Sequence, residues 1–204
     1  MPPQLAELVA PSRAALVLIE VQPGVVGAAS ALPQLAEAAN KIGMVPKLAK
    51  LGHAARQAGV PVVHCTAETL PGGFGRNRNA RLFGGAQRRG ALADDSSVQP
   101  IPEVFAEGDI VLPRYHGLGP FAGSRLDPLL RNEGISTVIL GGVSLNVALQ
   151  NAVFDCVNLA YQAVVLGDAV VGVPTEYGDA VLENTLSLLA TIATCDEVAG
   201  AWKG

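Results

Sequence analysis

The stretch Ala14-Ala15-Leu16-Val17-Leu18-Ile19-Glu20 is a nearly continuous apolar run that ends in an acidic residue. Such a run is typical of a β-strand in a parallel sheet that helices cover on both faces. Four more runs have this character, and a sixth, weaker one lies near the C-terminus. These are residues 60–65, 109–112, 137–140, 162–166 and, last, 191–194.

Helical patterns lie between these runs. Apolar residues recur three and four positions apart in 45–58, 125–132, 146–160 and 176–189. Strands that alternate with helices predict right-handed crossovers and a parallel sheet. We therefore predict a three-layer α/β/α fold with a mostly parallel, doubly wound sheet of about six strands. The 204 residues suit a single domain, 1–204, and function is expected just beyond the carboxyl ends of its strands.

Composition excludes several classes of protein. The formal net charge is −4, which argues against a nucleic-acid partner. The apolar runs are far shorter than the ~20 residues that span a bilayer, and no secretory signal is evident, so we expect a cytoplasmic protein without a membrane partner. With 50% hydrophobic and 16% charged residues, apolar surface remains to be covered, and a homo-oligomer is expected.

Residues 70–100 interrupt the alternating pattern. This segment is rich in glycine and arginine and has little periodicity. Two interpretations stay open: a solvated insertion between the second and third strands, or a lid or subunit-contact segment, because long loops in compact domains are usually functional. Its five arginines are Arg76, Arg78, Arg81, Arg88 and Arg89.

Several familiar sites are absent from the sequence. It has no GxxxxGK[ST] loop and no GxSxG elbow, and its glycine-rich turns do not fit the dinucleotide fingerprint. Its three histidines lack the paired spacing of a zinc site. We therefore expect neither a cofactor nor a metal.

Short segments at the predicted strand ends resemble the isochorismatase-like hydrolases, also called the cysteine hydrolase family. They are residues 14–22, 108–114, 121–127, 137–148 and 167–169, and the resemblance covers about residues 12–202. The resemblance implies the predicted α/β fold and a small-molecule substrate. It also implies a mechanism in which an aspartate is the general base, a lysine lowers the thiol pKa, and a cysteine attacks a carbonyl carbon.

All three of those positions are substituted in this sequence. The aspartate position holds Glu20, the lysine position holds Arg114, and the cysteine position holds Ala148. Glu20 keeps a carboxylate, whereas Arg114 keeps the charge but does not exchange protons. Two roles stay open for Glu20: a general base, or a partner of Arg114 in a bidentate ion pair, which would lower the pKa of Glu20 and make it a poorer base. The Ala148 methyl group excludes the inherited covalent route.

Three other residues could in principle replace the missing cysteine as the nucleophile: Cys156, Cys65 and Ser144. Cys156 lies two helical turns beyond Ala148, and Cys65 ends the second strand; both are expected to be structural. Ser144 would need Glu20 or His116 as a base, and we expect it instead to cap the following helix or to satisfy hydrogen-bond donors of the turn.

Five residues beside these positions are expected to bind substrate. They are Gln22, His116, Phe121, Val143 and Ser144. His116 is either an exposed loop residue or a partner of Glu20 in activating water. Two functions stay open: a hydrolase of small carbonyl-bearing metabolites (amides, imides or a vinyl ether) that uses no cysteine, or an inactive family member that binds a ligand or assembles into oligomers.

Overall fold

The sheet is six-stranded and wholly parallel in the computed structural model, which describes residues 4–28, 30–83 and 95–203. The strand order is β3-β2-β1-β4-β5-β6, so the chain winds outward from β1 in one direction and then returns to β4. The predicted fold class is confirmed. The strands are β1 (Ala14–Ile19), β2 (Val62–Ala67), β3 (Ile110–Arg114), β4 (Thr137–Val143), β5 (Gln162–Val171) and β6 (Thr191–Ala193).

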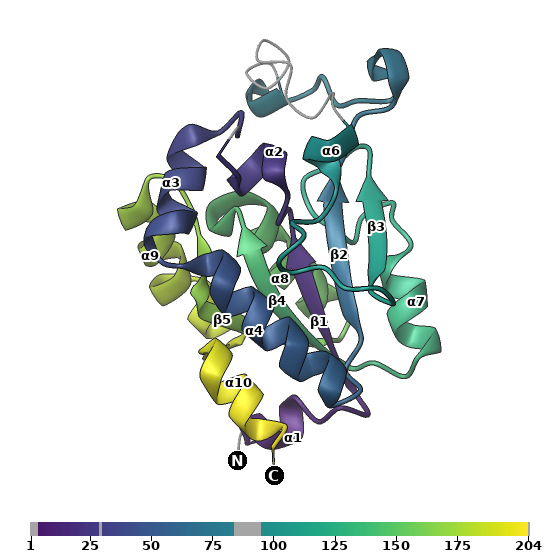
Figure 1. Cartoon of the computed structure of the whole chain (residues 1–204), viewed down its shortest axis with the longest axis vertical. Helices are drawn as coiled ribbons and strands as arrows, with labels where there is room; N and C mark the ends of the chain where they lie inside the picture. The colour runs from purple at the N-terminus through teal and green to yellow at the C-terminus, as the bar shows by residue number, and fades with distance from the viewer. Residues whose placement is uncertain (1–3, 29, 84–94, 204) are drawn as a thin grey trace.

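Helices cover both faces of this sheet (Figure 1). One face carries α1 (Leu5–Leu8), α2 (Pro23–Val26), α3 (Pro33–Lys41), α4 (Met44–Gln57) and α10 (Cys195–Ala201). The other carries α7 (Leu126–Asn132), the π-helical turn η2 (Leu145–Leu149), α8 (Gln150–Asn158) and α9 (Thr175–Asn184). The shorter elements are η1 (Pro71–Gly73), α6 (Asp95–Val98) and η3 (Leu186–Leu188).

The periodic patterns explain the contacts of the longer helices. In α4, Met44, Leu48 and Leu51 are buried against the sheet at the predicted helical spacing. In the segment after β4, Ala148 and Ala152 lie four residues apart and both are buried in the opposite core. Each core therefore forms from an apolar helix stripe and one face of the same strands.

Strands β4 and β5 are longer than predicted. β4 continues through Gly141–Val143, which the sequence assigned to a turn, because β1 and β5 pair with it there. Gly142 makes this possible: its φ is 104°, and a Cβ at this position would lie 2.2 Å from the Ile19 carbonyl oxygen. β5 likewise continues to Val171, so Asp168 lies within the strand and not after it.

Other boundaries also differ. The helix expected over 176–189 ends at Asn184 and is followed by η3. The sequence did not predict α1, α2, α3 or α10, whose apolar repeats are too short to reveal a helix. The weak sixth strand is confirmed as β6.

The insertion leaves the sheet at its carboxyl edge. Figure 1 shows the described residues after β2 rising beyond the strand ends. Arg76, Arg78 and Arg81 are exposed there, whereas Arg88 and Arg89 lie outside the described residues. Among the described residues, no helix combines the length and apolar character needed to cross a bilayer.

A buried charged cluster joins α4 to β2 and the start of β3. Arg56 donates to both carboxylate oxygens of Asp109 at 2.8 and 2.6 Å, and the His64 ring nitrogen Nε2 lies 2.9 Å from Oδ2. Burial alone would raise the pKa of Asp109, but hydrogen bonds from Arg56, His64 and the Ala106 amide hold it below its usual value. Burial lowers the pKa of His64 despite the neighbouring carboxylate.

Replacing Asp109 by asparagine is expected to cost about 2 kcal/mol of unfolding free energy at pH 7, because it leaves the half-buried Arg56 guanidinium without its counter-charge. The exposed Asp196→Asn variant is the control, with an expected loss under about 1 kcal/mol. Urea unfolding measures both values. Equal losses in the two variants would contradict the role of the cluster.

Candidate active site

Glu20 and Arg114 form an ion pair at the carboxyl edge of the sheet. Glu20 follows β1 directly, and Arg114 is the last residue of β3. Arg114 Nη2 donates to Glu20 Oε1, and Arg114 Nη1 donates to the carbonyl oxygen of Gly117. The predicted pair is therefore present, but it is not bidentate, because the guanidinium divides its bonds between Glu20 and a loop carbonyl.

The pair also spans a strand. The two residues do not end adjacent strands, because β2 lies between β1 and β3. Cys65 and Ala67 of β2 pair with Ile19 and Arg114 respectively. The ion pair therefore connects the ends of β1 and β3 across the end of β2.

The pairing with Arg114 lowers the pKa of Glu20, as predicted, but the net pKa of this carboxyl is raised. Burial raises the pKa of the Glu20 carboxyl by more than the charge and hydrogen bond of Arg114 lower it. Both side chains are largely buried, with 16% and 13% of their surfaces exposed. Desolvation therefore dominates, and Glu20 holds a proton more readily than an ordinary glutamate.

Ala148 lies in the first helical turn after β4. It is the fourth residue of η2 and is 3% exposed. Ile19 of β1 pairs with Gly142 of β4, so Glu20 and the segment that leads to Ala148 start from neighbouring strand ends. The peptide bond between Val143 and Ser144 is cis.

Ser144 does not cap the helix as predicted. Its Oγ donates to Asn146 Oδ1 at 2.8 Å, and its side chain accepts no helix N–H. Asn146 in turn donates to the Val173 carbonyl oxygen after β5, at 3.1 Å. The hydroxyl is therefore used to join the turn after β4 to the end of β5. Asn146 was overlooked because a single amide in an apolar stretch carries no sequence signal.

Gln22 is fully buried and bonded to main chain. Its Oε1 accepts from the Ala67 N–H at 2.8 Å, and its Nε2 donates to the carbonyl oxygens of Ala67 and Val98 at 3.1 and 2.6 Å. With both ends of the amide occupied, Gln22 fastens the two ends of the insertion to the chain after β1. Direct contact with substrate stays a prediction for this residue.

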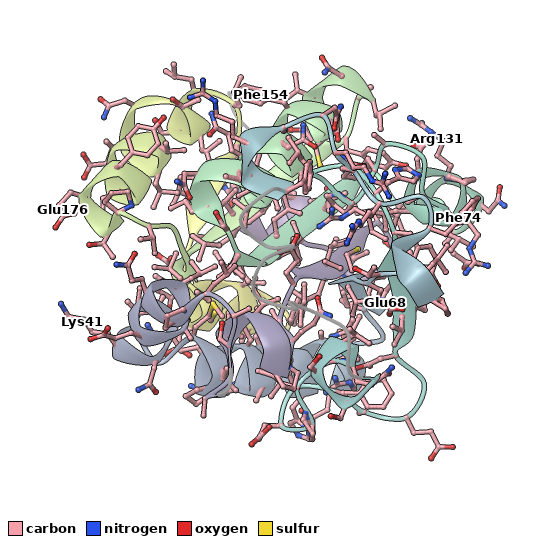
Figure 2. The ribbon with its side chains drawn as sticks, turned by 90° about the horizontal axis from the view of Figure 1, so that it is seen from above. Lys41, Glu68, Phe74, Arg131, Phe154 and Glu176 are labelled. Atoms are coloured by element: carbon pink, nitrogen blue, oxygen red, sulfur yellow. The ribbon has the colours of Figure 1, made fainter. Side chains whose placement is uncertain are left out.

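The other expected substrate-binding residues differ in exposure. His116 is exposed, and its ring packs so close to Gly123 that a Cβ there would lie 2.5 Å from His116 Cε1. Phe121 and Val143 are buried in the two cores, at 5% and 0% exposure. Figure 2 looks onto this edge of the sheet, with Glu68 at the end of β2 nearer the centre than Phe74 of the insertion.

The three thiols are buried and protonated. Burial raises the pKa of Cys65, Cys156 and Cys195 to about 12 in each case. Cys65 interacts electrostatically with Arg114 and Glu20, which places it beside the ion pair. None of the three lies on the helix turn that holds Ala148.

A metal site is not evident in the described part of the chain, where no group of three or more His, Cys, Asp or Glu side chains is arranged to bind an ion.

A family model for the isochorismatase domain matches residues 14–197, which include both charged residues and Ala148. The chain belongs to the isochorismatase family. Two solved structures share the fold of this chain. An isochorismatase family protein from Burkholderia thailandensis has a TM-score of 0.78 and 25% identity, with 95% of this chain and 97% of that chain covered. A cysteine hydrolase from Pseudomonas syringae pv. phaseolicola has a TM-score of 0.78 and 19% identity, with 95% and 93% covered.

Two further relatives carry named activities. The N-carbamoylsarcosine amidase from Thermoplasma acidophilum has a TM-score of 0.69 and 25% identity, covering 90% of this chain and 97% of that one. Ureidoacrylate amidohydrolase RutB from Stutzerimonas stutzeri is 33% identical over 109 residues, which are 52% of this isochorismatase-family chain and 40% of that protein. The match therefore spans well under half the length of that relative.

Proposed function

We propose that this isochorismatase-family chain hydrolyses the C–N bond of a small amide-type substrate, using water in place of a cysteine. The observation that carries the proposal is the buried Glu20 carboxyl, whose pKa is raised, at the strand edge beside Arg114. A carboxylate with a raised pKa is suited to general acid–base catalysis near neutral pH. The named amidohydrolase and amidase relatives support an amide or ureido substrate.

The proposed step needs no covalent enzyme intermediate. Ionised Glu20 takes a proton from water as the oxygen adds to the substrate carbonyl carbon. The carbonyl oxygen gains the negative charge, and in this proposal Arg114 and N–H groups at the start of the helix after β4 stabilise it. Protonated Glu20 then returns the proton to the departing nitrogen, so amide and water give acid and amine.

The neighbouring residues take supporting roles in this proposal. Ser144 is partly exposed at the turn, and His116 is exposed on the loop after β3, so these two supply polar contacts to the substrate. Phe121 and Val143 shape the apolar wall, and Ala148 leaves room where a thiol would otherwise stand.

Incubation with four substrate types tests the proposal: a primary amide, a ureido acid, a cyclic imide and a vinyl ether, with products followed by mass spectrometry. Turnover of the amide or the ureido acid is expected, and Glu20→Gln is expected to lower kcat at least about 100-fold. Cys65→Ala is the matched control and is expected to retain activity, since that thiol is protonated. Equal loss in the cysteine variant would contradict a water mechanism.

A second function is favoured by one specific observation. Glu20 is already paired with Arg114, and Ala148 has no reactive group, which suits a family member that binds a ligand without turning it over. Saturable binding of a substrate from the same set, measured by calorimetry without product formation, would support this function over hydrolysis.

A further inference from the structure

We propose that Asn77, in the insertion, is a positioning residue that holds the Arg114 guanidinium against Glu20 through the turn at Gly117. The inference deepens the proposed function, because it concerns the two charged groups assigned there. It also gives the insertion a role at the site, which is to orient the Arg114 side chain.

The contacts form a chain from the insertion to the ion pair. Asn77 Oδ1 accepts a hydrogen bond from the Gly117 N–H at 3.1 Å. The carbonyl oxygen of Gly117 accepts from Arg114 Nη1, and Arg114 Nη2 pairs with Glu20. Asn77 is half-buried although its neighbours Arg76 and Arg78 are exposed, as expected of a side chain that turns inward from a surface segment.

The turn at Gly117 depends on hydrogen bonds for its position. Gly117 has a φ of 81°, and a Cβ added there would meet no described atom within 4 Å. Packing therefore does little to hold this residue in place. When Asn77 no longer accepts from the N–H, the carbonyl oxygen that orients Arg114 is free to move.

The Arg114 backbone, in contrast, is fixed without Asn77. Arg114 pairs with Ala67 in the sheet, and its carbonyl oxygen accepts from the Glu68 N–H at 2.9 Å. Loss of Asn77 is therefore expected to move the guanidinium and leave the strand unchanged. This separates a positioning role from a general loss of fold.

The insertion is fastened at its base as well. Gln22, two residues after Glu20, bonds to the main chain of both Ala67 and Val98, and the Ile101 N–H donates to the Val21 carbonyl oxygen at 3.0 Å. These contacts act on the segment after β1, which begins with Glu20, whereas Asn77 acts on the loop after β3, which begins beside Arg114.

The titration of Glu20 tests this role without a substrate. The side-chain carboxyl is followed by ¹³C NMR in labelled protein and assigned by its loss in Glu20→Gln. Asn77→Ala is expected to raise the apparent pKa of Glu20 by roughly half a unit, because a displaced Arg114 stabilises the carboxylate less. The other ionisable group beside Glu20 is Cys65, which stays a neutral thiol over this range.

Asn79→Ala is the matched control, since Asn79 is exposed in the same segment. It is expected to leave the Glu20 titration unchanged, and Asn77→Gln, which keeps an acceptor oxygen, is expected to lie closer to wild type than Asn77→Ala. Asn77→Ser replaces the alanine variant if the latter does not fold. An unshifted titration in a folded Asn77→Ala or Asn77→Ser variant would overturn the inference.

The outcome is separable from that of the proposed function. A shifted Glu20 titration in a chain that turns over none of the four substrate types supports the positioning role and counts against hydrolysis. Turnover with no shift in the titration supports hydrolysis and rejects the role of Asn77. Where turnover is found, Asn77→Ala should also displace the acidic limb of the kcat/KM profile upward in pH.

Discussion

Replacing Ala148 by cysteine is expected to create a thiol that reacts with iodoacetamide at pH 7 at least about ten times faster than any native cysteine. The native thiols are buried with pKa values near 12, so almost none of them is ionised at that pH. A thiol at position 148 lies in the first turn after β4, where the helix N-terminus favours an anion. One unit of pKa corresponds to about a tenfold change in thiolate.

Ala152→Cys is the matched control for this variant. Ala152 lies one turn further along the same helix and is fully buried, so a thiol there is expected to remain as unreactive as Cys156. Labelled peptides are quantified by mass spectrometry over time. Equal reactivity of the two introduced thiols would contradict the prediction that Ala148 occupies the position of the family's nucleophilic cysteine.

Replacing Arg114 by methionine is expected to cost about 3 kcal/mol of unfolding free energy at pH 8, because the variant leaves the Glu20 carboxylate buried without its partner. The loss should be smaller at pH 5. Burial already raises the pKa of folded Glu20 above the ordinary 4.5, and removal of the guanidinium raises it further. Stability from the bound proton is therefore complete below pH 4.5 and disappears as pH rises through the folded pKa.

Urea unfolding at the two pH values measures this effect. Lys50→Met is the control, since Lys50 and Asp196 form an exposed pair whose loss should cost under about 1 kcal/mol at either pH. The double variant Glu20→Gln, Arg114→Met should recover much of the stability, because no buried charge is left alone. A loss that is the same at pH 5 and pH 8 would contradict a desolvated Glu20.

The sheet was the most predictable part of the structure. Continuous apolar runs marked five strands, and alternation with helices gave the parallel arrangement. The strand ends were less predictable. Gly141–Val143 has the composition of a turn, and it is a strand because β1 and β5 pair with it. The short helices around α2 and α3 escaped prediction for a similar reason: neighbouring elements stabilise them more than their own sequences do.

The ion pair of the candidate site was predicted, but its electrostatics were not. Glu20, Arg114 and Ala148 were singled out by the family resemblance, their role as site residues stays a prediction, and the ion pair between the first two followed from opposite charge. The sequence did not indicate that β2 lies between the paired residues, or that burial outweighs Arg114 in setting the pKa of Glu20. The contact of Asn77 with Gly117 could not be predicted either, because the two residues are 40 positions apart along the chain.

The sequence by itself determined the alternation of strands and helices and the residue types at positions 20, 114 and 148, whereas the assignment of these positions to the family's catalytic residues stays a prediction. These are properties of residue type and local order. The tertiary structure decided how Glu20 is desolvated, which carbonyl shares Arg114, and where Gln22 and Asn77 fasten the insertion. Desolvation and hydrogen bonding across the fold depend on distances between segments remote in sequence, which residue order alone does not specify.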